Sequence, residues 1–145
     1  MIRKSEQEDM RRIVDIWLDA SLMAHDFIPE SYWREKVEVM KSLYLPRAVT
    51  FVYEEESTPG IQGFVSMLDS HIEALFVAPE HQGKGVGGKL MEYVKTLSPR
   101  WTVNVYSENS RAVNFYFSQG FIVTGEEYDE NTGHRELTME YRCFR

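Results

Sequence analysis

Apolar residues recur every three or four positions in two segments near the start of the chain, which is the spacing of one helical face. The first segment carries Met10, Ile13, Val14, Trp17 and Leu18. Ser5 and Glu8 form a capping-box pattern just before it, so a helix is expected to begin there. A second helix is expected over residues 33–44 and is expected to end at Pro46.

The same spacing predicts two more helices in the second half of the chain. The third carries Val86, Leu90, Val94 and Leu97, and the fourth carries Ala112, Val113, Tyr116 and Phe117. Asn109 or Ser110 is expected to cap the start of the fourth helix, and Gly120 is expected to end it.

β-Branched and aromatic residues mark the segments expected to be strands. These segments are residues 2–3, 48–53, 61–68, 72–77, 101–106, 121–125 and 137–141. Turn residues at 57–60 and 129–133 predict two hairpins, whereas helical connections predict parallel neighbours. The order of elements therefore predicts an α/β fold with a mixed, mostly antiparallel sheet of about seven strands, flanked by four helices.

Length, composition and charge narrow the class of protein. The 145 residues contain no repeat or long linker, so a single domain over residues 1–145 is expected. The net charge of −7 repels phosphate backbones, so a nucleic-acid partner is disfavoured. A cationic partner is compatible with this charge. A lone cysteine, Cys143, excludes an internal disulfide and fits a reducing compartment.

The sequence also bears on location and on metals. The residues after Met1 form no apolar signal-like stretch, and no apolar run approaches the length that spans a bilayer. A cytoplasmic protein without membrane contact is therefore expected. The four histidines are scattered without H-x-x-x-H spacing, so no metal site is expected.

The most informative stretch is the glycine-rich segment 81–89, which follows an expected strand and opens an expected helix. Free N–H groups and the helix dipole make such a helix start an anion site. A turn that merely allows tight strand–helix packing is the alternative. Gly83, Gly85 and Gly88 also match the dinucleotide fingerprint, but three or four strands precede them where that fingerprint usually opens a fold. If the same residues formed a P-loop, Ser or Thr would be required at the position that Leu90 occupies.

A third pattern, Gln82-x-x-Gly85-x-Gly87, resembles the pyrophosphate loop of the GNAT N-acetyltransferase superfamily. A second block, Asn109-x-x-Ala112-x-x-Phe115-Tyr116 followed by Gly120-Phe121, resembles that family's later motif. The likeness covers essentially the whole chain and implies a GNAT fold whose sheet is splayed at an acetyl-CoA site. It implies that the cofactor is held by Phe76, Val77, Gln82, Gly83, Lys84, Gly85, Val86, Gly87, Gly88, Asn109 and Tyr116.

The resemblance makes Tyr116 the candidate general acid, because a phenol with a pKa of about 10 can protonate a departing thiolate of pKa about 8.5. Core packing is the alternative role. Glu73 is the candidate base, and strand alternation is expected to place its side chain with Leu75 and Val77. His71 is a weaker candidate on the same face.

Residues expected near the acceptor lie in the connection after the first helix and on a late strand. His25 and Phe27 belong to a segment that resembles one lining the acceptor pocket in small bacterial GNAT enzymes. Asn104 stands near the end of a strand beside the splayed gap. These residues, with His71, are the expected substrate contacts; a surface loop and ordinary buried polar groups are the alternatives.

The predicted function is acetyl transfer from acetyl-CoA to a primary amine of a protein lysine, an N-terminus or a small molecule. Direct attack in a ternary complex is expected, since Cys143 lies far from the glycine loop in sequence. A non-catalytic acyl-CoA binder and, with less support, a nucleotide-binding enzyme are the alternatives. The resemblance also allows a homodimer through the late strands.

Overall fold

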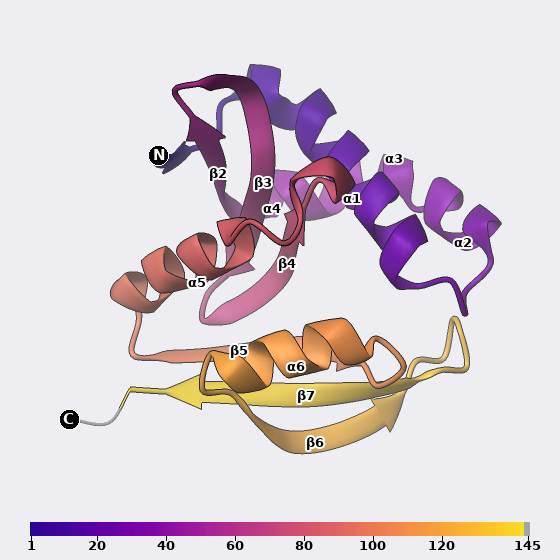
Figure 1. The fold of residues 1–145 in the computed structure, drawn as a ribbon. Helices are drawn as coiled ribbons and strands as arrows, with labels where there is room; N and C mark the ends of the chain where they lie inside the picture. Colours follow the sequence, from indigo (N-terminus) through magenta and orange to yellow (C-terminus); the bar gives the residue numbers. More distant parts are fainter. Residues whose placement is uncertain (144–145) are drawn as a thin grey trace.

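The computed structural model describes residues 1–143, and its centre is one mixed sheet of seven strands. The strands run in the order β1-β2-β3-β4-β5-β7-β6 (Figure 1). Only the neighbours β4 and β5 are parallel, which confirms the predicted sheet type. The strands are β1 (Ile2–Lys4), β2 (Val49–Glu55), β3 (Thr58–Leu68), β4 (His71–Val77), β5 (Arg100–Tyr106), β6 (Ile122–Tyr128) and β7 (Arg135–Arg142).

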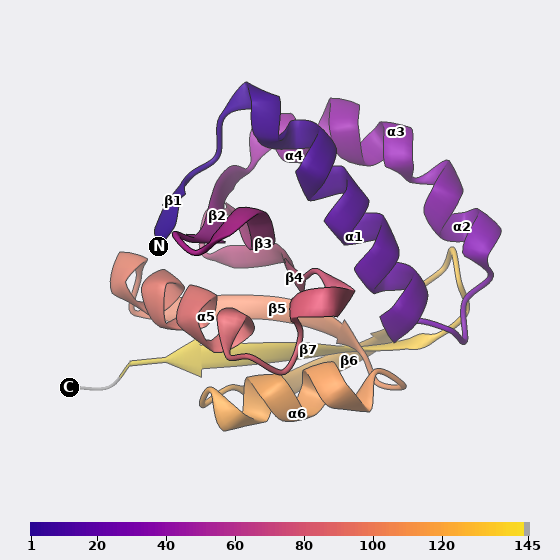
Figure 2. The same ribbon diagram turned by 45° about the horizontal axis from the view of Figure 1, so that its top comes forward.

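The helices form two groups around this sheet. Helix α1 (Met10–Ala24) lies beside the short helices α2 (Glu30–Glu35), α3 (Val37–Val39) and α4 (Leu45–Arg47), as Figure 2 shows. Helices α5 (Val86–Leu97) and α6 (Ser110–Ser118) lie apart from them, toward β5 and β7. Short helical turns occupy Gln7–Asp9, Met40–Tyr44 and Pro79–His81. Within residues 1–143, no helix combines the length and apolar character needed to cross a membrane.

Two local expectations at the N-terminal half are wrong in detail. The capping interaction lies one residue later than predicted, because the Asp9 carboxylate accepts the Glu6 N–H at 2.7 Å. The second helix is not continuous but is divided into α2, α3, a π-helical segment at Met40–Tyr44, and α4. Pro46 does not end this segment, since α4 follows the π-helical segment directly and continues through Pro46 to Arg47.

The sheet separates two hydrophobic cores. Successive residues of β3 point to opposite faces, so Phe64 joins the core under α1 and α2 whereas Val65 joins the core under α5. Leu90 of α5 and Phe121 before β6 are completely buried in the second of these cores. Each helix group is therefore held to its own face by apolar burial.

Strands β4 and β5 pair over a very short distance and then separate. Their register contains only His71↔Thr102 and Ile72↔Val103. The His71 ring joins the Thr102 hydroxyl at 2.7 Å, which fixes the strands where they still touch. Opposite β3, Ser66 pairs with Ala74 and Met67 with Ile72, so Glu73 is the extra residue of a β-bulge. The predicted splay of the sheet begins at this bulge.

Candidate active site

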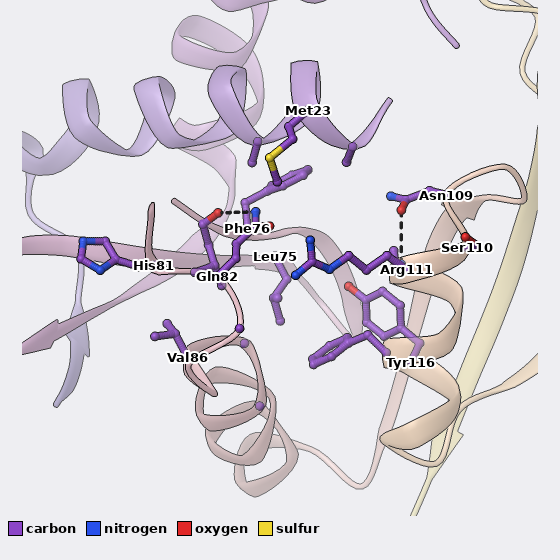
Figure 3. A pocket seen from close by; sticks show the side chains of 18 of the residues that line it. Met23, Leu75, Phe76, His81, Gln82, Val86, Asn109, Ser110, Arg111 and Tyr116 are labelled. Carbon is purple, nitrogen blue, oxygen red and sulfur yellow. Dashed lines mark hydrogen bonds between the residues drawn. The ribbon is translucent and has the colours of Figure 1, made fainter. Parts of the chain in front are cut away.

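A cavity of about 580 Å³ lies where β4 has separated from β5. Figure 3 shows it enclosed by α1, the end of β4, the start of α5 and the start of α6. It is lined by Ala20, Met23, Ala24, Asp26, Leu75, Phe76, Val77, His81, Gln82, Gly83, Gly85, Val86, Gly87, Gly88, Glu108, Asn109, Ser110, Arg111, Ala112, Phe115 and Tyr116. Every predicted cofactor-binding residue except Lys84 is in this set. We refer to it as the first cavity.

The glycine loop leaves open space and unused donors at the start of α5. Gly83 and Gly85 have φ angles of +78° and +85°, which side chains rarely adopt, and Gly85 is the N-cap of α5. A Cβ atom at Gly83, Gly85 or Gly88 would meet no atom within 4 Å. Packing therefore does not require these three glycines, whereas the free N–H groups of the first helical turn fit an anion.

Two contacts hold the loop against its neighbours. The Gln82 side chain donates from Nε2 to the Val77 carbonyl at 3.0 Å. Gly87 faces the Phe115 ring of α6, which a Cβ there would meet at 3.5 Å. Gly87 is thus the one glycine of the loop at which close packing contributes. Beyond Ile72, the edge of β4 that faces β5 is free of strand pairing, so its backbone groups are open to an extended ligand.

Tyr116 lies on α6 and its side chain is only 6% exposed. Its hydroxyl is directed into the first cavity beside the Arg111 side chain (Figure 3). Burial raises the pKa of Tyr116 above its usual value, so the phenol keeps its proton at neutral pH. A protonated hydroxyl in this place has the property required of a proton donor.

Asn109 is confirmed as the residue that caps α6. Its Oδ1 accepts the backbone N–H of Ala112 at 3.2 Å. Its side-chain nitrogen lies 3.2 Å from Nε2 of His25, the residue that ends α1. The Asn109 side chain therefore also connects the end of α1 to the start of α6, which forms part of the wall of the first cavity.

A second cavity, of about 310 Å³, borders β4 at the bulge. Its walls combine aromatic rings with two carboxylates and a few other groups. The lining residues are Trp17, Tyr32, Trp33, Lys36, Met40, Tyr44, Leu45, Ala48, Ser66, Glu73, Asp129 and Asn131. We refer to it as the second cavity.

The expected orientation of Glu73 is wrong. Leu75 and Val77 pack against the core under α5, whereas Glu73 lines the second cavity with Trp17 and Trp33 on the α1 side. The bulge adds one residue to β4 and breaks the two-residue alternation on which the expectation was based.

Acidic residues surround Asp129, which lines the second cavity. The Tyr106 hydroxyl donates to Asp129 at 2.6 Å, and burial together with this bond raises the pKa of Tyr106. Burial also raises the pKa of Glu136, and the charges of Asp129 and Glu127 add to the effect. Each carboxylate raises the cost of ionising its neighbours. Of this group only Asp129 lines the second cavity, whose wall also contains Glu73 and the positively charged Lys36.

The other predicted site residues do not line either cavity. Lys84 is exposed, and His71 fixes β4 to β5. Asn104 is exposed on β5 and accepts a hydrogen bond from Thr138 at 3.2 Å. Phe27 packs between His25, Tyr106 and His134.

Sequence reasoning missed residues that both cavities use. Arg111 stands inside the recognised Asn109-to-Tyr116 block, and its positive charge next to the cap was an available signal. Met23 and Ala20 looked like ordinary positions of an amphipathic helix. Asp129 lies in a turn 56 residues after Glu73, and no sequence signal brings the two together.

His25 is 7% exposed, and burial lowers its pKa from 6.5 to about 4. The unfolded chain therefore takes up a proton near pH 6.5, whereas the folded chain takes it up only near pH 4. The stability that the neutral ring contributes is complete above pH 6.5 and is lost as the pH falls toward 4.

We expect the free energy of unfolding to fall by about 2 kcal/mol between pH 7 and pH 5 because of this group alone. Urea denaturation of the wild type and of His25→Phe at both pH values measures it, since the variant keeps an aromatic ring but has nothing to protonate. Equal losses in the two proteins would contradict the assignment.

Comparison with known proteins agrees with this geometry. A family model for the acetyltransferase (GNAT) domain matches residues 23–143. The chain is 34% identical over 133 residues to the peptidyl-lysine N-acetyltransferase YiaC of Escherichia coli (strain K12), covering 91% of this chain and 90% of that protein. It is 35% identical over 132 residues to the peptidyl-lysine N-acetyltransferase YjaB of Salmonella typhimurium, with coverage of 91% and 90%.

A solved structure agrees over nearly the whole length. The solution structure of apo-form YjaB from Escherichia coli superposes with a TM-score of 0.86 at 33% identity, covering 99% of this chain and 98% of that one. The fold, the glycine loop and the Asn109-to-Tyr116 block all lie within these matches. The chain therefore belongs to the GNAT family of N-acetyltransferases.

Proposed function

We propose that this N-acetyltransferase moves the acetyl group of acetyl-CoA to the side-chain amine of a lysine in a protein or peptide, by direct attack within a ternary complex. The observation that carries the proposal is the first cavity, in which a glycine-lined anion site adjoins the open edge of β4. The printed names of YiaC and YjaB support lysine as the acceptor. The continuous sheet from β1 to β6 supports the predicted single domain.

The residues of the first cavity fit acetyl-CoA. The open space beside Gly83, Gly85 and Gly88 and the free N–H groups of the first turn of α5 suit the pyrophosphate, and Arg111 adds a positive charge at the same cavity. The unpaired edge of β4 at Phe76 and Val77 suits an extended pantetheine arm. Bound acetyl-CoA supplies a thioester that an amine can attack, with a thiolate as the leaving group.

The second cavity fits a lysine side chain. Trp17, Trp33 and Tyr32 offer aromatic walls for the methylene stem and for a positive charge. Lysine has a pKa of about 10.4, so the incoming amine carries a proton that must be removed before attack. Glu73 lies in this cavity and is the group that we assign to that step, directly or through water.

Tyr116 is assigned as the proton donor to the thiolate. Its buried phenol retains a proton and is directed into the first cavity. Direct attack is favoured because Cys143, the one thiol in the sequence, is exposed after β7 and does not line the first cavity. A cytoplasmic location and a homodimer remain predictions from the sequence.

Gly88→Glu is expected to weaken acetyl-CoA binding by more than tenfold, because it places a carboxylate at the anion site. The fold should persist, since a Cβ at Gly88 meets no atom within 4 Å and an acidic residue suits a first helical turn. Calorimetric titration gives the affinity. Gly88→Gln, of equal size without charge, is the control, and unchanged affinity in Gly88→Glu would contradict the loop assignment.

Tyr116→Phe is expected to lower kcat about 100-fold while acetyl-CoA affinity stays within a few-fold, since only a proton donor is removed. Thiol release measures turnover, and titration measures affinity. Tyr128→Phe is the matched control because Tyr128 is 72% exposed on β6. A full kcat in Tyr116→Phe would leave Tyr116 as a packing residue, and no turnover in the wild type would favour a non-catalytic acyl-CoA binder.

The acceptor class is tested with a peptide whose N-terminus is blocked and which contains one lysine. We expect thiol release with this peptide and none when norleucine replaces the lysine. Glu73→Gln should reduce turnover about 100-fold near neutral pH and leave acetyl-CoA affinity unchanged. Turnover only with peptides that have a free N-terminus would replace lysine by the α-amine as the acceptor.

A further inference from the structure

His25 lies between the walls of the two cavities. Its ring stacks on Trp33 of the second cavity at a centroid distance of 4.9 Å. It contacts the edge of Tyr106 at 5.3 Å, and Tyr106 in turn holds Asp129 of the second cavity. On its other side, Nε2 lies 3.2 Å from the side-chain nitrogen of Asn109, which lines the first cavity.

The hydrogen bonds fix which nitrogen of the ring carries the proton. Asn109 Oδ1 accepts the Ala112 N–H, so the amide NH₂ is the end that faces His25. The amide is a donor, and Nε2 must therefore accept. The ring proton is on Nδ1, which is buried and has no hydrogen-bond partner among residues 1–143.

This arrangement costs free energy of folding if the His25 ring contributes only core packing. A buried N–H without a partner loses its hydration and gains nothing in return, whereas a phenylalanine would make the same stack without that loss. What a histidine adds here is the acceptor at Nε2, and that acceptor touches one group only, the Asn109 amide.

Asn109 can transmit binding at the first cavity to the ring. It caps α6, the helix that also carries Arg111 and Tyr116, both of which line that cavity. A ligand that orders the start of α6 also orders the Asn109 amide, and with it the plane of the His25 ring. The ring stacks on Trp33 at an interplanar angle of 24°, so a change in the ring plane acts directly on one face of the Trp33 indole, whose edge contacts are with Trp17 and Tyr32.

We propose that His25 is a positioning residue that couples the two cavities, so that CoA bound in the first cavity orders the Trp33 wall of the second cavity before the acceptor arrives. The inference rests on the proposed function only in taking the second cavity as the acceptor site. Coupling of this kind is reciprocal, so each ligand strengthens the binding of the other.

The first experiment needs no acceptor. The indole N–H of Trp33 is buried and without a partner among residues 1–143, which makes its NMR signal a sensitive reporter. Saturating CoA is expected to move this signal in the wild type and in the control Tyr128→Phe, whose side chain is exposed on β6, and to leave it in place in His25→Phe. His25→Phe keeps the stacking on Trp33 and removes only the acceptor for Asn109.

The second experiment measures binding of Nα-acetyl-lysine methylamide with and without CoA. We expect CoA to tighten its binding at least fivefold in the wild type, and less than twofold in His25→Phe. Asn109→Ala should lose the same coupling, and the double variant should lose no more, because both substitutions break one link. His25→Gln, which restores an acceptor, should recover part of it.

The outcomes separate the two proposals. A Trp33 signal that CoA moves equally in wild type and His25→Phe, or does not move in the wild type, overturns the coupling and leaves acetyl transfer intact. A Trp33 response that depends on His25, together with no binding of the lysine probe, supports the coupling and overturns the assignment of the acceptor.

Discussion

The structure depends on the short length over which β4 and β5 pair with each other. Two residue pairs and the bond between His71 and Thr102 hold the two strands at one end. Beyond them a bulge at Glu73 redirects β4, and the backbone that would have paired with β5 is left open. Backbone groups need hydrogen-bond partners, so solvent or a bound ligand must supply them along the open edge of β4.

The two cavities next to this opening differ in the groups that line them. The first ends on backbone N–H groups at the start of α5 and on Arg111, which suits the phosphates of a cofactor. The second contains Glu73 and Asp129 beside aromatic rings, which suits an ammonium group. Strand β4 borders both, so an acyl donor in the first cavity and an amine in the second can approach the same strand.

Local sequence determined much of the first cavity. The glycine loop must open a helix after a strand, and Asn109 must cap the helix that carries Tyr116, because those roles depend on residues within a few positions of each other. The two hairpins and the parallel pair β4–β5 could also be anticipated, since hairpins and helical connections restrict the neighbours of each strand. The insertion of β7 between β5 and β6 could not, and it makes the expectation of parallel neighbours wrong for the connection through α6. Lys84 differs because an exposed lysine has no local signal for the direction of its side chain.

The sequence by itself determined the GNAT fold, and it predicted an anion site at the glycine loop and Tyr116 as a candidate proton donor. Only the tertiary structure decided to which face of the sheet the Glu73 side chain points, because a bulge depends on the register with β3 rather than on the residues of β4. It also decided that Asp129 shares a cavity with Glu73, and that His25 is enclosed between Trp33 and Asn109. These residues are far apart in the chain, and only the packing of α1 and α2 against the sheet brings them together.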